Sequence, residues 1–403
     1  MDVAIIGGGA AGFFAAITVK ENHPGAKVAI FEKTKNLLAK VKVSGGGRCN
    51  VTNACADIKQ LSDAYPRGKT ALKRAFHTFN TQHAMQWFES RGVPLIAQDD
   101  HRVFPASQNS QTIIDCFLNQ TQKLGIQIET GCGVRSIRPI DDQLELNFSD
   151  NAPAQRFDKI IVASGGSPQR KGLQWLERLG HKMIDPVPSL FTFNCPGEPI
   201  TELMGIAVED ARVSIQGTKL KSQGPLLITH WGMSGPAVLK LSAFGARILS
   251  EMDYEFNIQV NWAATINNDL VMIELRDIAN QHPGKVLPKI KPYSLPERLW
   301  RFLLEKCELP ATKKWGELSK KATNQLVNVL TNDVYSVKGK TTFKEEFVTC
   351  GGVSLASIDF NTMQSKACKN LYFAGEVLDI DGVTGGYNFQ AAWTTGYIAG
   401  QLK

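Results

Sequence analysis

Residues 3–12 read VAIIGGGAAG, and this short stretch decides the fold. The apolar run Val3–Ile6 predicts a strand that is buried on both faces, as in a parallel sheet. The glycines lead into an apolar stretch from Ala10 to about Lys20, which predicts a helix, and residues 27–31 predict the next strand. The order of strand, glycine turn, helix and strand is that of a βαβ unit.

The spacing of these glycines predicts a dinucleotide-binding turn. Gly7, Gly9 and Gly12 form the pattern G-x-G-x-x-G between a strand and a helix, the context that makes the pattern informative. The first glycine permits a tight turn, the second lets the backbone approach a pyrophosphate, and the third allows close helix–strand packing. Ala10 and Ala11 lie in the first helical turn, where free N–H groups and a partial positive charge favour phosphate.

An acidic residue completes this motif. Glu32 follows Gly12 by 20 residues, at the end of the second predicted strand, where its carboxylate can accept hydrogen bonds from ribose hydroxyls. We place Lys33 in the same site.

Later segments favour FAD over NAD. FAD extends beyond one βαβ unit, so it needs contacts from chain segments that return to the same sheet. Ser164 and Gly165 end a buried strand, and Gly375-Glu376 ends another, with Gly386 opening the last helix. A carboxylate at Glu376 can bind ribityl hydroxyls, and the N-terminus of that helix would stabilise negative charge on a reduced flavin. Residues 131–136 lack the third glycine of a second such motif, which would bind NAD(P)H.

The change in the pattern of predicted strands and helices along the chain predicts an interrupted domain. After Pro186 and Pro188, the α/β pattern gives way to short β-like runs and amphipathic helices, and it returns near residue 370. The predicted fold class is therefore α/β, with a Rossmann-like FAD-binding domain (a glutathione-reductase-like βαβ fold) interrupted by a mixed α+β insert domain. The predicted ranges are 1–190 and 345–403 for the FAD domain and 191–344 for the insert, with small β-barrel-like and helical subdomains. We expect residues 33–53 to form a basic, glycine-rich loop and residues 70–91 to form a helix.

Composition narrows the class of protein. In the 403 residues, 45 Lys and Arg face 38 Asp and Glu, and this mild basic bias suits an anionic cofactor or a weak polyanion partner without proving either. Eight scattered cysteines form no C-x-x-C pair, which argues against a disulfide framework and a zinc ribbon. We expect no metal site, no membrane segment and a cytoplasmic location.

Three blocks of sequence resemble a known family. They are residues 44–53 (SGGGRCNVTN), residues 229–236 (THWGMSGP) and residues 373–390, from FAGE to GGYNFQ. In these blocks, and nearly from end to end, the chain resembles the YhiN/BaiN-like family of FAD-dependent NAD(P)/FAD oxidoreductases, which includes enzymes described as aminoacetone oxidases.

The resemblance implies further cofactor contacts. It places the loop of residues 44–53 along the FAD, with Arg48, Cys49 and Asn50 near the pyrophosphate, ribityl chain or ring, and it implies backbone contacts from Val134 to adenine. Together, motif and resemblance assign to the cofactor Gly7, Gly9, Ala10, Ala11, Gly12, Glu32, Lys33, Ser44, Gly45, Gly46, Arg48, Cys49, Asn50, Val134, Ser164, Gly165, Gly375, Glu376, Asp381, Gly386, Asn388 and Phe389.

The function expected from these observations is FAD-dependent oxidoreduction. We expect a hydride to pass between a small organic substrate and flavin N5, with NAD(P)H as electron donor. One alternative is an oxygen-dependent amine oxidase similar to aminoacetone oxidase, and another is an FAD-containing protein that binds or modifies RNA. The dispersed charge argues for no nucleic acid partner. His230 is the candidate acid–base residue of the insert, since a histidine can relay a proton near neutral pH.

Overall fold

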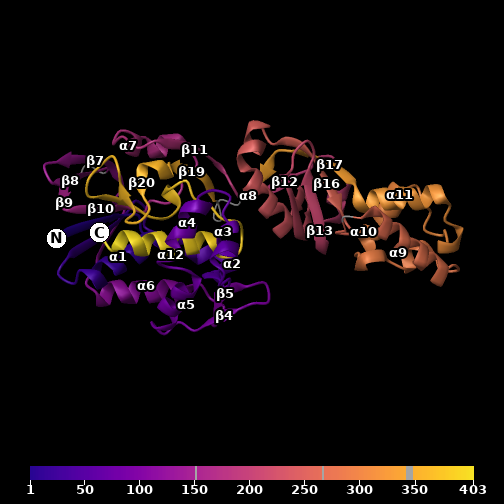
Figure 1. Cartoon of the computed structure of the whole chain (residues 1–403), viewed down its shortest axis with the longest axis horizontal. Coiled ribbons are helices and arrows are strands. Elements are labelled where there is room, and N and C mark those ends of the chain that lie inside the picture. The colour runs from indigo at the N-terminus through magenta and orange to yellow at the C-terminus, as the bar shows by residue number, and fades with distance from the viewer. Residues whose placement is uncertain (150–151, 266, 342–347) are drawn as a thin grey trace. The chain divides into compact units, whose positions relative to one another are not determined.

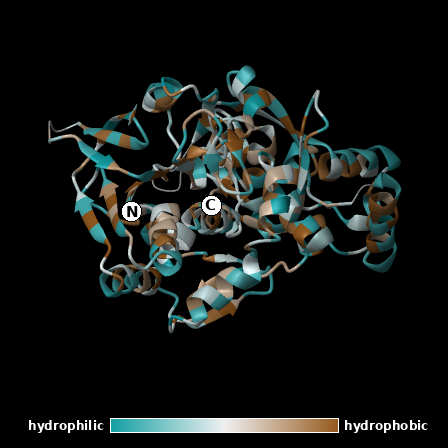
Figure 2. Ribbon diagram, turned by 60° about the vertical axis from the view of Figure 1, so that its left-hand side comes forward, coloured by the Kyte–Doolittle hydropathy of each residue, from teal (hydrophilic) through white to brown (hydrophobic). Residues whose placement is uncertain are grey.

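The protein is described from a computed structural model that covers residues 1–149, 152–265, 267–341 and 348–403. Its chain forms two compact units, one from Met1–Ser189 with Phe343–Lys403 and one from Leu190–Thr342. Each unit is described by itself. Apolar residues, brown in Figure 2, recur along the strands and helices of both units and form a separate core in each.

A seven-stranded sheet organises the first unit. Its strand order is β20-β21-β22-β10-β1-β2-β6, parallel from β22 to β6 and antiparallel at β20 and β21. The bounds of these strands are β1 (Asp2–Ile6), β2 (Lys27–Glu32), β6 (Gln127–Thr130), β10 (Lys159–Val162), β20 (Ile358–Asp359), β21 (Gln364–Ser365) and β22 (Leu371–Phe373). The chain leaves β1 for β2 on one side, while β10 lies on the other side. This arrangement creates a switch point at the carboxyl end of β1, where open α/β sheets bind their ligands.

The remaining elements of the first unit surround this sheet. Its helices are α1 (Ala10–Asn22), α2 (Ala39–Gly47), α3 (Ile58–Asp63), α4 (Lys69–Ala75), α5 (Thr81–Glu89), α6 (Gln111–Lys123), α7 (Gln174–Glu177), α12 (Tyr387–Gly400), and the short η1 (Arg170–Leu173), η6 (Leu355–Ser357) and η7 (Gly375–Val377). Smaller sheets contain β3 (Thr52–Asn53), β4 (Leu95–Ala97) and β5 (Arg102–Pro105), then β7 (Val134–Ile140), β8 (Gln143–Phe148) and β9 (Gln155–Phe157), and the pair β11 (Met183–Pro188) and β19 (Thr349–Val353).

Helices α1 and α12 lie side by side in the first unit (Figure 1). Their close approach depends on small residues, because a Cβ at Gly396 would lie 2.9 Å from the Ala11 carbonyl oxygen and a Cβ at Gly400 would lie 2.6 Å from Thr18. The β7–β9 sheet also packs on the central sheet, where Phe31 of β2 contacts Phe148 and Phe157. The strand Val3–Ile6 is therefore buried on both faces, as its continuous apolar run predicts.

The second unit has its own seven-stranded sheet, in the order β17-β16-β13-β14-β15-β12-β18. Its strands are β12 (Thr192–Asn194), β13 (Ala207–Ile215), β14 (Lys221–Thr229), β15 (Gly232–Ser234), β16 (Glu255–Asn261), β17 (Asp333–Lys338) and β18 (Lys340–Thr341). Its helices are α8 (Pro236–Glu251), α9 (Asn268–Gln281), α10 (Glu297–Lys306), α11 (Lys320–Thr331), and the short η2 (Pro199–Leu203), η3 (Leu287–Lys289), η4 (Pro292–Ser294) and η5 (Trp315–Glu317). Buried Asp333 accepts hydrogen bonds from Trp262, Tyr335 and Lys306, which ties α10 to the sheet.

Two expectations from the sequence are wrong. Residues 70–91 form two helices, α4 and α5, because Asn80 begins a new helix with a capping box in which its side chain accepts from the N–H groups of Gln82 and His83. Residues 33–53 are not a plain loop, since they contain α2. In the part of the chain that the structure describes, no helix is long and apolar enough to cross a bilayer.

Candidate functional site

The glycine turn lies at the carboxyl end of β1 and begins α1. Gly7 has a φ of +116°, and a Cβ on it would lie 2.3 Å from the carbonyl oxygen of Ala163. A Cβ on Gly12 would lie 1.9 Å from the Gly7 carbonyl oxygen. A Cβ on Gly9, in contrast, would meet no atom of the described residues within 4 Å, apart from its chain neighbours. Gly7 and Gly12 therefore permit the close packing of the turn, and Gly9 leaves open space beside the backbone.

The N-terminus of α1 faces this turn without a side-chain cap. Gly9 is the N-cap residue, and no described side chain accepts a hydrogen bond from the first turn, which holds Ala10, Ala11 and Gly12. The first N–H groups of a helix have no partner within the helix. They offer donors and a partial positive charge to an anion at this position.

The side chain of Glu32 binds the backbone of the glycine turn. Its Oε2 accepts from the N–H of Gly8 at 2.8 Å, and its Oε1 accepts from the N–H and hydroxyl of Thr34, both at 2.9 Å. A carboxylate has about four lone-pair sites, so it keeps capacity for a ribose hydroxyl. The segment that leads into Val134 lies beside it, because Cys132 N–H donates to the Glu32 carbonyl and a Cβ at Gly133 would lie 3.5 Å from Lys33 Cβ. The structure thus brings Glu32, Lys33 and Val134 together.

The C-terminal segment returns to the same place. A Cβ on Gly375 would lie 2.7 Å from Ala11 Cβ, so η7 lies against the first turn of α1. Glu376 is held by two partners: its Oε1 accepts from Thr349 N–H at 2.8 Å and its Oε2 pairs with Lys40 Nζ at 2.6 Å. The end of β10 is close too, since a Cβ on Gly166 would lie 2.6 Å from Glu376 Oε1. Ser164 and Gly165 immediately precede this glycine, and Gly165 has a φ of +74° with open space beside it.

Residues 44–50 connect α2 to the N-terminus of α12. Ser44, Gly45 and Gly46 leave helical geometry inside α2, and both glycines have positive φ. With its amide turned so that both ends are satisfied, Asn50 donates to the Thr52 and Val103 carbonyls and accepts from the Gly386 N–H at 2.8 Å. The side chain of Asn50 therefore holds the 44–53 segment against the N-cap of α12.

Arg48 and Cys49 differ in exposure. The Arg48 guanidinium lies 4.2 Å above the Phe104 ring, and its Nε donates to the Gly45 carbonyl at 3.1 Å. The Arg48 side chain is half-exposed. Cys49 is fully buried, and burial raises the pKa of its thiol to about 12, against the lowering effect of a hydrogen bond with Ser44. At neutral pH it is a protonated thiol and not the nucleophilic thiolate of a redox centre.

The loop before α12 is closed by internal contacts. Asn388 exchanges two hydrogen bonds with the backbone of Gly382, at 2.8 and 2.9 Å, and Phe389 stacks on Trp393 with ring centroids 5.5 Å apart. The buried carboxylate of Asp381 accepts from Arg67 through both oxygens and from the Ser189 hydroxyl. Asp381 and Asn388 therefore fix the loop that presents Gly386.

His230 belongs to the second unit. It is exposed in the turn between β14 and β15, with its ring 4.4 Å from that of Trp231 in an edge-to-face contact. Its proposed acid–base role stays a prediction.

Sequence reasoning missed the residues that lock these segments together. Lys40 pairs with Glu376, and Arg67 pairs with Asp381, across 336 and 314 residues of chain. The basic character of residues 33–53 was the only signal for Lys40. No local pattern singles out Arg67, because its partner is distant in the sequence.

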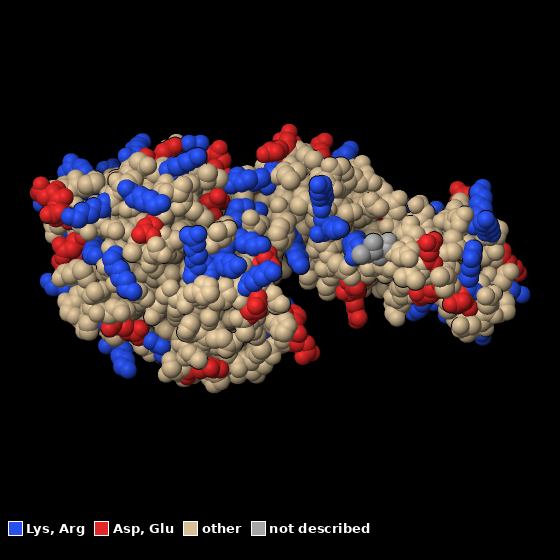
Figure 3. All heavy atoms as spheres, viewed as in Figure 1, with Lys and Arg blue, Asp and Glu red and all other residues tan. Residues whose placement is uncertain are grey.

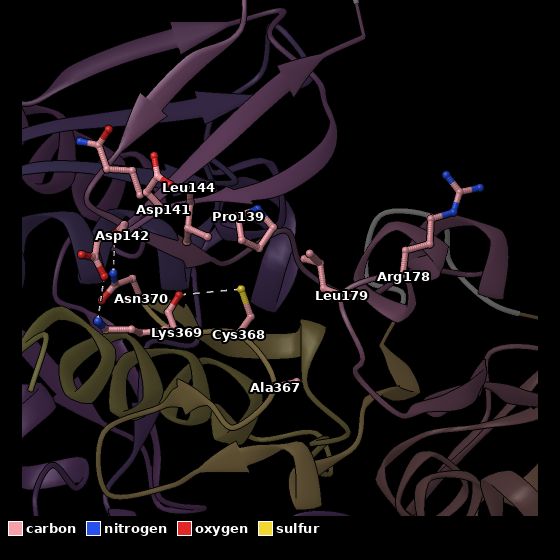
Figure 4. A pocket seen from close by; sticks show the side chains of 11 residues that line it. Pro139, Asp141, Asp142, Leu144, Arg178, Leu179, Ala367, Cys368, Lys369 and Asn370 are labelled. Atoms are coloured by element: carbon pink, nitrogen blue, oxygen red, sulfur yellow. Dashed lines mark hydrogen bonds and ion pairs between the residues drawn. The ribbon is translucent and has the colours of Figure 1, made fainter.

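A pocket of about 360 Å³ lies elsewhere in the first unit (Figure 4). Its walls come from the β7–β8 hairpin, Arg178–Leu179 and residues 367–370, and Lys369 pairs with Asp142 at 3.0 Å across it. Residues 367–370 directly precede β22, so this pocket lies at the amino end of a parallel strand. Dinucleotides bind at the carboxyl ends, so this pocket is not the dinucleotide site.

Comparisons with known proteins agree with this architecture. The chain is 28% identical over 414 residues to the ribosomal RNA dihydrouridine synthase of Escherichia coli, covering 99% of this chain and 97% of the relative. It is 26% identical over 410 residues to the 3-dehydro-bile acid delta(4,6)-reductase of Clostridium scindens, covering 99% and 98%. Among solved structures, the 3-ketosteroid delta1-dehydrogenase of Sterolibacterium denitrificans matches in fold, with a TM-score of 0.53, 10% identity, and 99% and 98% coverage. A family model described as HI0933-like protein Rossmann domain matches residues 1–402, and the chain, whose motifs resemble the YhiN/BaiN-like proteins, belongs to this family.

Proposed function

We propose that this protein is an FAD-dependent reductase that adds hydrogen across a carbon–carbon double bond next to a carbonyl group. The observation that carries the proposal is that four segments meet at the uncapped N-terminus of α1, which the first of them contains. These segments are residues 7–12, 40–50, 164–166 and 375–388. A dinucleotide that needs only one βαβ unit would not require the last three.

The residues present fit FAD. The open space beside Gly9 and the free N–H groups of the first α1 turn suit a pyrophosphate, and Glu32 suits a ribose. Lys40 and Arg48 add positive charge in the segment that contacts the N-cap of α12. The chemistry that FAD supplies when bound is hydride transfer.

The residues of the chain itself bind and orient the cofactor and stabilise charge on it. The N-terminus of α12 begins at Gly386 without a side-chain cap, so its partial positive charge favours negative charge beside it. The Asp381–Arg67 pair and the Asn388 hydrogen bonds keep this terminus in place. Such preorganised dipoles act best where water is excluded.

The names of the relatives support reduction of a conjugated double bond. A delta(4,6)-reductase acting on a 3-dehydro compound reduces a double bond conjugated with a ketone. Forming dihydrouridine from uridine saturates a double bond conjugated with a ring carbonyl. Both reactions consume two electrons, so we propose NAD(P)H as the donor that returns them to the flavin.

Between these two substrate classes we favour a uridine in RNA. The observation that favours it is a group of exposed cations on α3 and α4 of the first unit, at the surface that Figure 3 shows in blue over these helices. The sequence favours a small-molecule substrate without nucleic acid, and this proposal takes the RNA alternative in its place.

The test is anaerobic reduction of the purified flavoprotein by NADH or NADPH, followed by addition of an oxidised substrate. We expect rapid bleaching of the flavin absorbance, and its return with uridine-containing ribosomal RNA but not with the same RNA in which dihydrouridine is already present. A flavin that neither nucleotide bleaches, but that a small amine bleaches and that dioxygen, once admitted, reoxidises with formation of peroxide, would replace this proposal with the amine oxidase alternative.

A further inference from the structure

One face of the first unit concentrates positive charge on two short helices. We define the α3–α4 surface by Lys59 of α3, Lys69, Lys73 and Arg74 of α4, and Lys366 near β21. All five are exposed. The guanidinium of Arg74 and the ammonium of Lys73 make no hydrogen bond or ion pair with any described residue.

The carboxylates on this surface do not balance the cations. Asp63 pairs with Lys69 at 2.5 Å, and the pKa of Asp63 is lowered mainly by its hydrogen bond to Lys69, with further lowering by the charges of Lys69, Lys59 and Lys73. Asp359 accepts from the backbone N–H and side-chain amide of Asn361, which satisfies its own turn. With Asp57, the exposed N-cap of α3, counted as well, five cations against three carboxylates leave the surface positive.

A cleft borders the α3–α4 surface, between the start of α4 and residues 355–366. Its volume is about 610 Å³, and its walls include Lys69, Arg74, Lys366 and the half-buried ring of Phe360. Cations and an aromatic ring lining one cleft are the two elements with which proteins hold single-stranded nucleic acid, through phosphate pairing and base stacking.

The same surface is joined to the candidate flavin site. Arg67, one residue before the turn into α4, forms the buried ion pair with Asp381, and a Cβ at Gly68 would lie 2.7 Å from Ile380 Cγ1. Tyr65 donates to the Tyr387 carbonyl at 2.6 Å, in the first turn of α12. The cationic helices and the loop that presents Gly386 therefore share one framework.

We propose that the α3–α4 surface binds the phosphodiester backbone of the substrate RNA and holds it beside the flavin site. This inference rests on the proposed function, which it extends by assigning the RNA to a particular face. Lysine and arginine side chains with no carboxylate partner pair with phosphates and release counterions, so binding depends strongly on salt. Lys73 and Arg74 are adjacent on α4 and neither has a side-chain partner among the described residues, so this pair is the one to test.

The experiment compares Lys73→Gln/Arg74→Gln with the wild type in binding a fluorescein-labelled, uridine-rich RNA hairpin over a series of salt concentrations. The matched control is Lys27→Gln/Lys123→Gln, which removes two exposed cations from other faces of the same unit. Loss of two phosphate contacts lowers the slope of log affinity against log salt by about 1.4–1.8, which corresponds to about 25- to 60-fold weaker binding at about 0.1 M salt if the two lines meet at 1 M. We expect this loss in the test variant and wild-type behaviour in the control.

Four readouts keep the inference separate from the proposed function: flavin content, melting temperature, RNA binding and flavin reduction by NADPH. Equal flavin content and melting temperature in all three proteins show that the variants are folded. Wild-type binding of RNA with an unchanged slope in Lys73→Gln/Arg74→Gln would overturn the assigned surface while leaving the proposed function intact. Absence of RNA binding in the wild type would overturn the RNA substrate itself. Unaltered RNA binding with slower flavin reduction by NADPH would assign the surface to the nucleotide donor and refute our inference.

Discussion

The buried pair between Arg67 and Asp381 offers a sharp test of how the candidate site is held. The Asp381 side chain is 0% exposed and that of Arg67 is 14% exposed. In Arg67→Met, the carboxylate loses two charge-assisted hydrogen bonds and keeps the one from Ser189. At about 1.5–3 kcal/mol each, the two bonds correspond to about 3–6 kcal/mol, in line with about 3–5 kcal/mol for removing one partner of a buried pair.

The loss should depend on pH. Burial, the largest cause, raises the pKa of Asp381, while Arg67 and Ser189 lower it. Without Arg67 the pKa of the native state rises further above that of the unfolded chain. The native state then binds the proton more tightly between the two values, so the stability of the variant falls as pH rises through this window. The free energy of unfolding that Arg67→Met loses relative to wild type is therefore smaller at about pH 5 than at about pH 8.

The assay is urea unfolding followed by pulsed hydrogen exchange on peptides from β1 and α12, which reports on the first unit alone. Lys369→Met is the control, because its pair with Asp142 is exposed (77% and 90%) and should contribute nothing measurable. Arg67→Met/Asp381→Leu removes both charges and should recover most of the loss. A single variant as stable as the control, or a deficit that grows at acid pH, would refute the reasoning.

Three further outcomes follow from the site. Gly12→Ala forces a Cβ to within 1.9 Å of the Gly7 carbonyl oxygen, so FAD retention after gel filtration should be lost, whereas Gly25→Ala, with open space beside it, should retain FAD like the wild type. Glu376→Gln removes the charge that pairs with Lys40 and should weaken FAD binding about tenfold, the equivalent of about 1.4 kcal/mol, as measured by fluorescence titration. Cys49→Ser should leave the rate of flavin reduction in stopped flow within about twofold of wild type, since the thiol is protonated at neutral pH; a larger drop would show that the thiol takes part in the reaction.

The sequence predicts the βαβ unit well because its determinants are local. The apolar strand, Gly7, Gly12 and Glu32 all act within about thirty residues of each other, and the structure joins them at the end of β1. Local signals also explain the errors. The capping box of Asn80 divides what hydrophobic periodicity alone predicts as one helix.

The contacts that complete the site are not local, and the sequence does not predict them. Pairing of Lys40 with Glu376 and of Arg67 with Asp381 depends on how the sheet brings distant segments together. The sequence places the flavin motif near the end of the chain, but it does not identify the residues that pair with Glu376 and Asp381. Many lysines and arginines hundreds of positions away carry the right charge, and the sequence alone does not choose among them.

The position of β22 in the sheet has a consequence for how the protein is made. Strands β1 and β10 are translated early, yet β22 and α12 complete the sheet and cover α1 only after all of the second unit has left the ribosome. The second unit is one continuous segment, so it can fold before β22 is made. During that time the edge of β10 that pairs with β22 has no partner strand. The β10 edge therefore offers unpaired backbone groups to other chains until β22 has been synthesised.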